Sequence, residues 1–180
     1  MRAAAVVIVL ASGTAWADRT PVIAVGGTMD IRFLGHDWDQ ANQQQTPLIA
    51  AGPRLTLTFE DPLPPKTPKG TARAEGRLVP ELFAGAYLGG QLGEGYAGAG
   101  LRGELMLAAP KARLGMYIAA RALAIGLHRD GAGEFGVGEY IQITDKFRFG
   151  WEGAAVVRPQ DRNGDRELDC VVNFYAGWRL

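Results

Sequence analysis

An alternation of apolar residues with charged residues or glycine recurs along most of this chain, and it constrains the fold more than any other feature. The clearest example is FRFGWEGAAVVR at residues 147–158, where three aromatic residues at odd positions alternate with Arg148, Gly150 and Glu152. Residues 172–180, VNFYAGWRL, repeat the pattern. Because successive side chains of a β-strand point to opposite faces, these segments predict strands with one apolar face and one face of charges and glycines.

Eight segments follow this pattern, which predicts an all-β protein. We expect strands near residues 22–35, 53–60, 76–92, 98–108, 112–127, 134–143, 147–158 and 170–180. The alternation is weakest in 112–127, whose alanines would also suit a helix. A strand is favoured because Gly115 and Gly126 lie within that segment, Pro110 precedes it and its neighbours are all strands. An even number of antiparallel strands can close into an up-and-down barrel with both termini at one end.

The lengths of the connections between strands predict how the two ends of the barrel differ. Residues 109–111 and 144–146 are tight turns, whereas 36–52 and 159–169 are long and polar. An up-and-down barrel then carries both turns at the end of the termini and both long loops at the other end, as is typical of outer-membrane barrels. The Pro-rich segment 61–75 is an exception, because it is long and yet lies at the barrel end that carries the tight turns. Its prolines predict a stiff linker.

The first residues have the form of a signal peptide. A basic start at Met1-Arg2 precedes an apolar run, and Ala15-Trp16-Ala17 fits a signal-peptidase site. The apolar run is too short to span a bilayer, and the alternatives are an N-terminal anchor or a buried first strand. We therefore predict a signal peptide at 1–17, export to a bacterial envelope, and a single β-barrel domain at 18–180.

Composition argues against several classes of protein. The formal net charge is zero, with 19 basic and 19 acidic residues, so we expect no nucleic-acid partner, since binding to phosphates needs clustered Lys and Arg. The single cysteine, Cys170, cannot form an internal disulfide and excludes a multi-cysteine metal site. It is most simply a small hydrophobic residue.

The charged face of the predicted strands mixes opposite charges with glycine. An eight-stranded barrel has an interior that side chains can fill, and buried ions must be paired because an unpaired one is costly. We therefore expect a charge network inside the barrel, formed by Asp30, Arg32, Arg102, Glu104, Arg148, Glu152 and Arg179. The network could conduct or gate, or it could be a salt-bridged plug, which the narrow bore favours. Glu139 is in phase with apolar neighbours, which predicts a charge on the lipid-facing side or a β-bulge.

On these features the chain resembles the small bacterial outer-membrane barrels of the OmpA, OmpX and OmpW kind. The resemblance rests on the signal-like start, the eight alternating segments and the terminal strand 172–180. That strand looks like the signal by which such proteins engage the barrel-assembly machinery, although it ends in Leu180 where an aromatic residue is usual. The resemblance implies a closed barrel in contact with outer-membrane lipid, and it transfers no function residue by residue.

Candidate chemistry is sparse. The only serine, Ser12, lies in the predicted signal peptide, which excludes a serine nucleophile such as the lipid hydrolases on similar barrels use. His36 and His128 lie far apart in the sequence, and a catalytic or metal role for them is less favoured than a polar surface role. We predict no enzymatic activity. Five aromatic residues are expected at the membrane interface or facing lipid: Trp38, Trp151, Trp178, Tyr140 and Tyr175.

One segment imitates a calcium loop. Asp161, Asn163, Asp165 and Asp169 place oxygen ligands at alternate positions. The glycine comes at the fourth position rather than the sixth, and Val172 stands where a calcium loop has Glu. A polar external turn at Asn163-Gly164 therefore competes with a calcium site, and calcium is the one cofactor that the sequence suggests.

Two functions remain open at this point. The first is a non-enzymatic outer-membrane barrel with a role in envelope structure, adhesion or contact with small apolar solutes. The second is a soluble periplasmic barrel of the lipocalin type that holds an apolar ligand. The lipocalin would turn Phe149 and Trp151 inward and Arg148 and Glu152 to water, whereas the membrane barrel requires the reverse.

Overall fold

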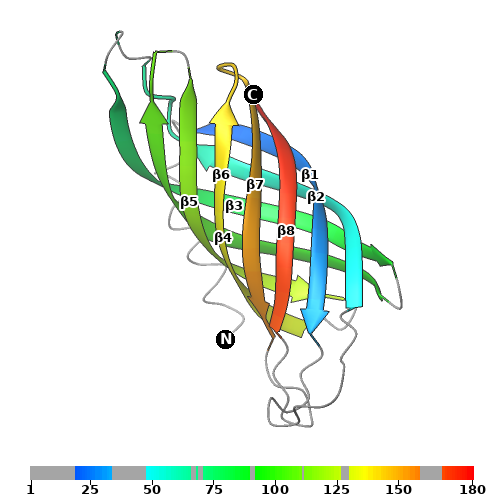
Figure 1. Ribbon diagram of the computed structural model, residues 1–180. Helices are drawn as coiled ribbons and strands as arrows, with labels where there is room; N and C mark the ends of the chain where they lie inside the picture. The colour runs from blue at the N-terminus through cyan, green and yellow to red at the C-terminus, as the bar shows by residue number, and fades with distance from the viewer. Residues whose placement is uncertain are drawn as a thin grey trace.

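The chain folds into a closed β-barrel. The computed structural model describes residues 19–33, 48–65, 68, 71–89, 92–110, 112–126, 130–158 and 168–180. They form β1 (Thr20–Phe33), β2 (Leu48–Glu60), β3 (Arg73–Gly89), β4 (Leu92–Ala108), β5 (Arg113–Ile125), β6 (Asp130–Gln142), β7 (Phe147–Val157) and β8 (Leu168–Arg179). Each strand pairs antiparallel with the next, and β8 pairs with β1 to close the sheet (Figure 1). The predicted all-β, up-and-down architecture is confirmed.

Several strands begin earlier than the sequence predicted, and β2 and β4 show the largest differences. β2 begins at Leu48 rather than near residue 53, and β4 begins at Leu92 rather than near residue 98. Glycine, which is depleted in strands, obscures the start of β4, yet this part pairs with β3 in continuous register. β5 alternates strictly between buried and more exposed residues, so the helix considered for the Ala-rich segment is wrong. Within the described part of the chain, no helix has the length and hydrophobicity needed to cross a membrane.

The barrel has two unlike ends. The terminal end carries the start of β1, the end of β8 and the connections 61–72, 109–112 and 143–146; it lies uppermost in Figure 1. The distal end carries the connections 34–47, 90–91, 126–129 and 158–167. The two predicted turns and the two long loops therefore lie at opposite ends, as predicted, and the distal end also carries two short connections.

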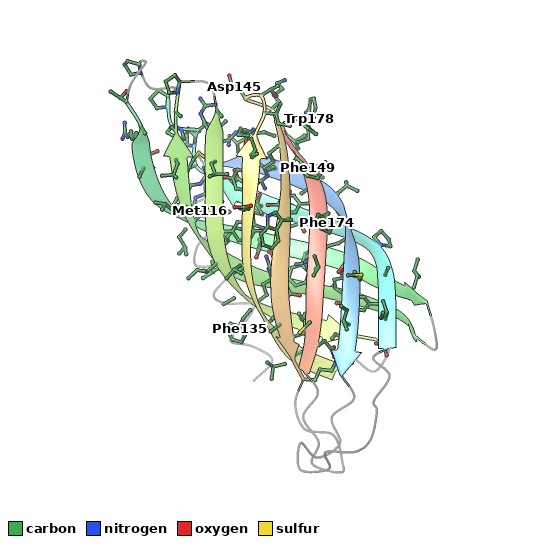
Figure 2. All side chains as sticks on the ribbon, in the orientation of Figure 1. Met116, Phe135, Asp145, Phe149, Phe174 and Trp178 are labelled. Atoms are coloured by element: carbon green, nitrogen blue, oxygen red, sulfur yellow. The ribbon has the colours of Figure 1, made fainter. Side chains whose placement is uncertain are left out.

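The outer face of the barrel wall is apolar and the inner face is charged, which is the reverse of the arrangement in a soluble protein. Large apolar side chains point outward, among them Ile118 and Phe135 at 67% and 61% exposure. Phe149, Phe174 and Trp178 also face outward on the wall nearest the viewer in Figure 2. The inward positions hold charged residues of which many are almost fully buried. This arrangement follows directly from the alternation in the sequence.

Inward-facing glycines make room for the large side chains of the interior. A Cβ atom at Gly115 would lie 2.3 Å from the ring of Tyr140, and one at Gly138 would lie 2.5 Å from the ring of Tyr117. Both rings therefore lie directly over the backbone of a neighbouring strand. The mixture of glycine and bulky polar residues on one face is what a narrow, filled barrel requires.

The Pro-rich connection between β2 and β3 covers the terminal end. Leu63 packs against an interior cluster that includes Met106 and Tyr140. The Pro64 carbonyl accepts a hydrogen bond from Nε of Arg113 at 2.9 Å, and the Asp61 carbonyl accepts one from Arg179 at 2.8 Å. Residues 61–64 are therefore tied to the barrel mouth, which gives this long connection a physical role at the end of the turns.

Candidate functional site

The interior of the barrel carries the candidate site, and its middle part holds a group of ion pairs that we call the central cluster. All six members are buried, and three cations balance three carboxylates: Arg54, Arg102, Arg121, Glu81, Glu134 and Glu152. They come from six different strands, β2 to β7. The cluster therefore ties most of the barrel wall together across its bore.

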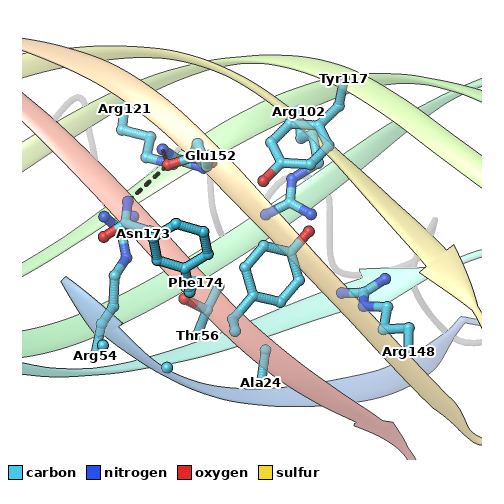
Figure 3. Close-up of a pocket in the computed structure, with 13 residues that line it drawn as sticks. Ala24, Arg54, Thr56, Arg102, Tyr117, Arg121, Arg148, Glu152, Asn173 and Phe174 are labelled. Atoms are coloured by element: carbon cyan, nitrogen blue, oxygen red, sulfur yellow. Dashed lines mark hydrogen bonds and ion pairs between the residues drawn. The ribbon is translucent and has the colours of Figure 1, made fainter.

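Arg121 is the centre of this cluster. Its guanidinium contacts Glu81 and Glu134 and forms a two-point ion pair with Glu152, with Nη1–Oε1 and Nη2–Oε2 distances of 2.7 and 2.5 Å. Asn173 donates a further hydrogen bond to Oε1 of Glu152 at 3.0 Å (Figure 3). Three carboxylates converge on one arginine, a geometry that suits its planar set of five donors.

The two other arginines extend the central cluster and lie over aromatic rings. Arg54 pairs with Glu134 at 3.1 Å, and its guanidinium carbon lies 4.4 Å from the centre of the Phe83 ring. Arg102 pairs with Glu81 at 2.8 Å and lies 3.9 Å from the centre of the Tyr117 ring. Cation–π contacts of this kind add to the attraction that holds a desolvated arginine in place.

A second group, the mouth cluster, lies toward the terminal end. Arg148 pairs with Glu60, while Arg77 bridges Glu60 and Glu104. Arg179 approaches Glu60 at 3.6 Å. The Tyr140 hydroxyl donates to Glu104. The mouth cluster thus comprises Glu60, Arg77, Glu104, Arg148 and Arg179 with Tyr140.

The space left between these side chains is small. A cavity of about 20 Å³ lies between the side chains of Arg54, Arg102, Arg121 and Arg148, and Tyr175 also lines it (Figure 3). That volume is room for about one water molecule. Toward the distal end the interior is aromatic, with the rings of Tyr87 and Tyr96 stacked at 4.6 Å between centres.

The structure places the predicted network residues as follows. Arg102, Glu104, Arg148 and Glu152 are buried inside the barrel, and Arg179 reaches the mouth cluster. Asp30 is also buried inside. Arg32 lies in β1, but its side chain is outside the described residues.

The observed ion-pair partners of Arg102 and Arg148 are not the nearest carboxylates on their own strands. Arg102 pairs with Glu81 rather than Glu104, and Arg148 pairs with Glu60 rather than Glu152. The observed partners lie on other strands: Glu81 is on β3, next to the strand of Arg102, and Glu60 is on β2, across the bore from Arg148. Sequence reasoning missed Arg54, Glu60, Arg77, Glu81, Arg121 and Glu134, although their positions in the alternating pattern of charges could have indicated them.

Two predictions about aromatic residues are wrong and two agree with the structure. Tyr140 and Tyr175 were expected at the interface or facing lipid, but both point into the barrel, where Tyr140 is 1% exposed. Their hydroxyls make them suited to a polar interior. Trp151 and Trp178 face outward as expected. Trp38 lies outside the described residues.

Glu139 points outward among apolar residues, and no β-bulge displaces it. The pairing of β6 is continuous through Met116–Glu139 and Glu139–Trp151. The carboxylate accepts a hydrogen bond from Nε1 of Trp151 at 2.7 Å. Of the two outcomes predicted for this residue, the outward charge is the one observed.

Most of the suggested calcium loop lies outside the described residues. Asp161, Asn163 and Asp165 lie outside the described residues, as do His36 and His128. Asp169 is buried in β8 and pairs with Arg158 at 3.1 Å. Among the described residues, no three His, Cys, Asp or Glu side chains are grouped so as to hold a metal ion.

Comparisons with known proteins add little to this description. No family model matches the chain, and no curated protein matches it. Among solved structures it is similar to Neisserial surface protein A, at 8% identity over 89% of this chain and 96% of that one, with a TM-score of 0.48. It is also similar to Ail, the attachment invasion locus protein of Yersinia pestis, solved with the heparin analogue sucrose octasulfate; identity is 9% over 91% and 99% of the two chains, with a TM-score of 0.41. At these values the likeness carries no argument, and the fold rests on the strand pairing of this chain.

Proposed function

We propose that this chain is a non-enzymatic outer-membrane β-barrel whose interior is closed by its own charged side chains. The observation that carries the proposal is the inversion of the two faces of the wall. Phe149 and Trp151 point outward while Arg148 and Glu152 are buried inside. A belt of exposed apolar side chains around a closed sheet is stable in hydrocarbon, where every backbone group must be paired within the protein.

The outward apolar face and the inward charged face also argue against the soluble lipocalin alternative. A soluble barrel that holds an apolar ligand needs an apolar interior, and here the middle of the bore is filled by the central cluster. The outward belt would instead be exposed to water, where contiguous apolar surface of this extent promotes association. The cavity of about 20 Å³ between the arginines offers no room for such a ligand.

The closed interior supports a structural or adhesive role rather than passage of solutes. The central and mouth clusters fill the bore, and residues 61–64 lie across the terminal end. We propose that the long distal connections, 34–47 and 158–167, lie on the outer side of the membrane, where they are free to contact other surfaces. In planar bilayers the protein should show no steady ion conductance.

The terminal strand supports a further part of the proposal. β8 keeps its apolar side outward to the last residues, including Phe174 and Trp178. We propose that this strand presents the assembly signal to the barrel-assembly machinery and that outer-membrane lipid surrounds the finished barrel. Replacing Trp178 with Asp should then reduce the amount of folded protein in the membrane, whereas Trp178→Phe, which keeps an apolar aromatic side chain there, should not.

Cell fractionation tests the proposal as a whole. The protein should pellet with membranes, resist extraction by salt, and migrate faster on gels before heating than after heating, because a closed barrel stays compact in detergent until heated. Release by osmotic shock without detergent, with no effect of heating on mobility, would instead identify a soluble periplasmic barrel and refute the proposal.

A further inference from the structure

The cavity of about 20 Å³ inside the barrel is lined from both clusters, and its lining is unequal in charge. The charged residues that line it are four arginines and one glutamate: Arg54, Arg102, Arg121, Arg148 and Glu152. Among the described residues, the other glutamates of the two clusters do not line it. Interactions between buried charges are only weakly screened, so this lining favours a negative charge inside the cavity.

Arg102 brings unused hydrogen-bond donors to the cavity. Its side chain is 3% exposed, its Nη2 donates to Glu81 at 2.8 Å, and its guanidinium lies over the Tyr117 ring (Figure 3). Nε and Nη1 of Arg102 have no hydrogen-bond partner among the described residues, and the same holds for Nε of Arg148. Because a buried cationic donor without a partner is costly, donors of this kind indicate an ordered water or an ion.

The two clusters together hold one more arginine than glutamate. The central cluster has three of each, whereas the mouth cluster has three arginines against Glu60 and Glu104. Asp30, another buried acid, does not line the cavity. It lies farther toward the distal end of β1, where it pairs in register with Ala50 and Val171 of the apolar cluster there. One monovalent anion in the cavity would therefore balance the charge of the two clusters.

We propose that this cavity binds one small monovalent anion, for which chloride is the probe. The anion accepts hydrogen bonds from Nε and Nη1 of Arg102, and the guanidinium of Arg148 attracts it from the side of the mouth cluster. It thereby joins the two clusters and stabilises the closed interior. This inference goes beyond the proposed function, because the cavity lies inside the wall whether lipid or water surrounds the barrel.

The size of the cavity restricts what can occupy it. Its volume is room for one species of about the size of a water molecule, which admits a halide and excludes a large organic anion such as gluconate. A water molecule is the alternative occupant, and it would donate to Oδ1 of Asn173, which also has no partner among the described residues. Four guanidinium groups against one carboxylate favour the anion over the water.

Crystals of the detergent-solubilised barrel, refolded in sodium bromide, test the site directly because anomalous scattering identifies bromide. Refolding in bromide lets the ion enter before the barrel closes around the cavity. We expect one bromide within hydrogen-bonding distance of Nε or Nη1 of Arg102. Density without an anomalous signal would identify a water molecule and overturn the proposal. Bromide found on the outer surface alone would show an adventitious ion only and would overturn it equally.

The stability of the barrel in two salts gives a second test. At equal ionic strength, sodium chloride should raise the urea midpoint of unfolding above its value in sodium gluconate. The unfolding equilibrium constant should fall roughly tenfold at a chloride concentration ten times the Kd of a single site. Equal midpoints of the unaltered protein in the two salts would contradict an anion site.

A pair of arginine variants assigns the chloride effect to the cavity. Arg102→Met removes the unused donors while Glu81 keeps its contact with Arg121, so the difference between the two salts should disappear. Arg73→Met is the matched control, because Arg73 is exposed and pairs with Glu75 outside the cavity, and it should keep the full difference. A chloride effect that survives in Arg102→Met would overturn the site. The bromide crystals of the unaltered protein decide the matter if Arg102→Met does not fold.

Discussion

Arg121 on β5 and Glu152 on β7 form a two-point ion pair that passes over the glycine of the strand between them. Their paired atoms lie 2.7 and 2.5 Å apart. A Cβ atom at Gly136 on β6 would lie 3.1 Å from Cδ of Glu152 and 3.2 Å from Nη1 of Arg121. The pair therefore depends on a missing side chain between its members, and it joins strands that do not pair with each other.

Replacing Arg121 with Met should destabilise the barrel by roughly 3–5 kcal/mol, because Glu81, Glu134 and Glu152 would lose the cation they share. The urea midpoint of unfolding in lipid vesicles, followed by gel mobility and tryptophan fluorescence, measures this loss. Arg73→Met is the control, because the pair of Arg73 with Glu75 is exposed, and it should cost less than about 1 kcal/mol. Equal costs for the two variants would mean that the central cluster does not stabilise the barrel.

Two glycines of β4 should differ in their tolerance of a methyl group. A Cβ at the inward-facing Gly100 would lie 2.5 Å from the Ala120 carbonyl oxygen and 2.6 Å from Cγ of Arg121, whereas one at Gly103 meets only Ile118 at 3.6 Å. Gly100→Ala should therefore destabilise by roughly 1–3 kcal/mol through overpacking, and Gly103→Ala should change stability little. Urea midpoints in vesicles decide the matter, and a lower midpoint for Gly103→Ala than for Gly100→Ala would contradict the packing described.

Leu63→Ala should release the Pro-rich connection without opening the barrel. The half-buried Leu63 packs against the interior cluster, so its truncation should speed trypsin cleavage after Lys66 or Lys69 by roughly tenfold, since local opening then costs about 1.4 kcal/mol less. Leu55→Ala, an outward-facing leucine of β2 at 51% exposure, is the control and should leave cleavage unchanged. Heat-dependent mobility should be normal in both variants, and an unaltered cleavage rate in Leu63→Ala would show that Leu63 does not hold the connection.

The fold and its orientation could be predicted from the sequence because both depend on a period of two. Spacing alone assigned Phe149 and Trp151 to one face of the wall. It assigned Arg148 and Glu152 to the other face, and the structure confirms both assignments. The earlier start of β4 could not be predicted, because glycine carries little strand propensity by itself. The inward-facing glycines of β4 leave room for side chains of neighbouring strands, since a Cβ atom at Gly98 would lie 2.6 Å from the Phe83 ring.

The pairing inside the barrel could not be predicted, and Arg121 shows why. It lies in the Ala-rich segment where alternation is weakest, and its partner Glu152 is on a strand two positions away. Which inward residues meet across the bore depends on the stagger of the strands around the barrel. Sequence spacing gives the face of each residue but not that stagger, so it could not pair Arg102 with Glu81 or Arg148 with Glu60.

The central claim is that the apolar face of the wall meets hydrocarbon, and the two outward tryptophans of the described strands report on it directly. In a Trp38→Phe variant of residues 18–180 refolded into vesicles, Trp151 and Trp178 remain as the reporters. Their fluorescence should be strongly quenched when the acyl chains carry bromine and only weakly quenched by acrylamide in the water. Strong quenching by acrylamide with no effect of the brominated chains would contradict the account.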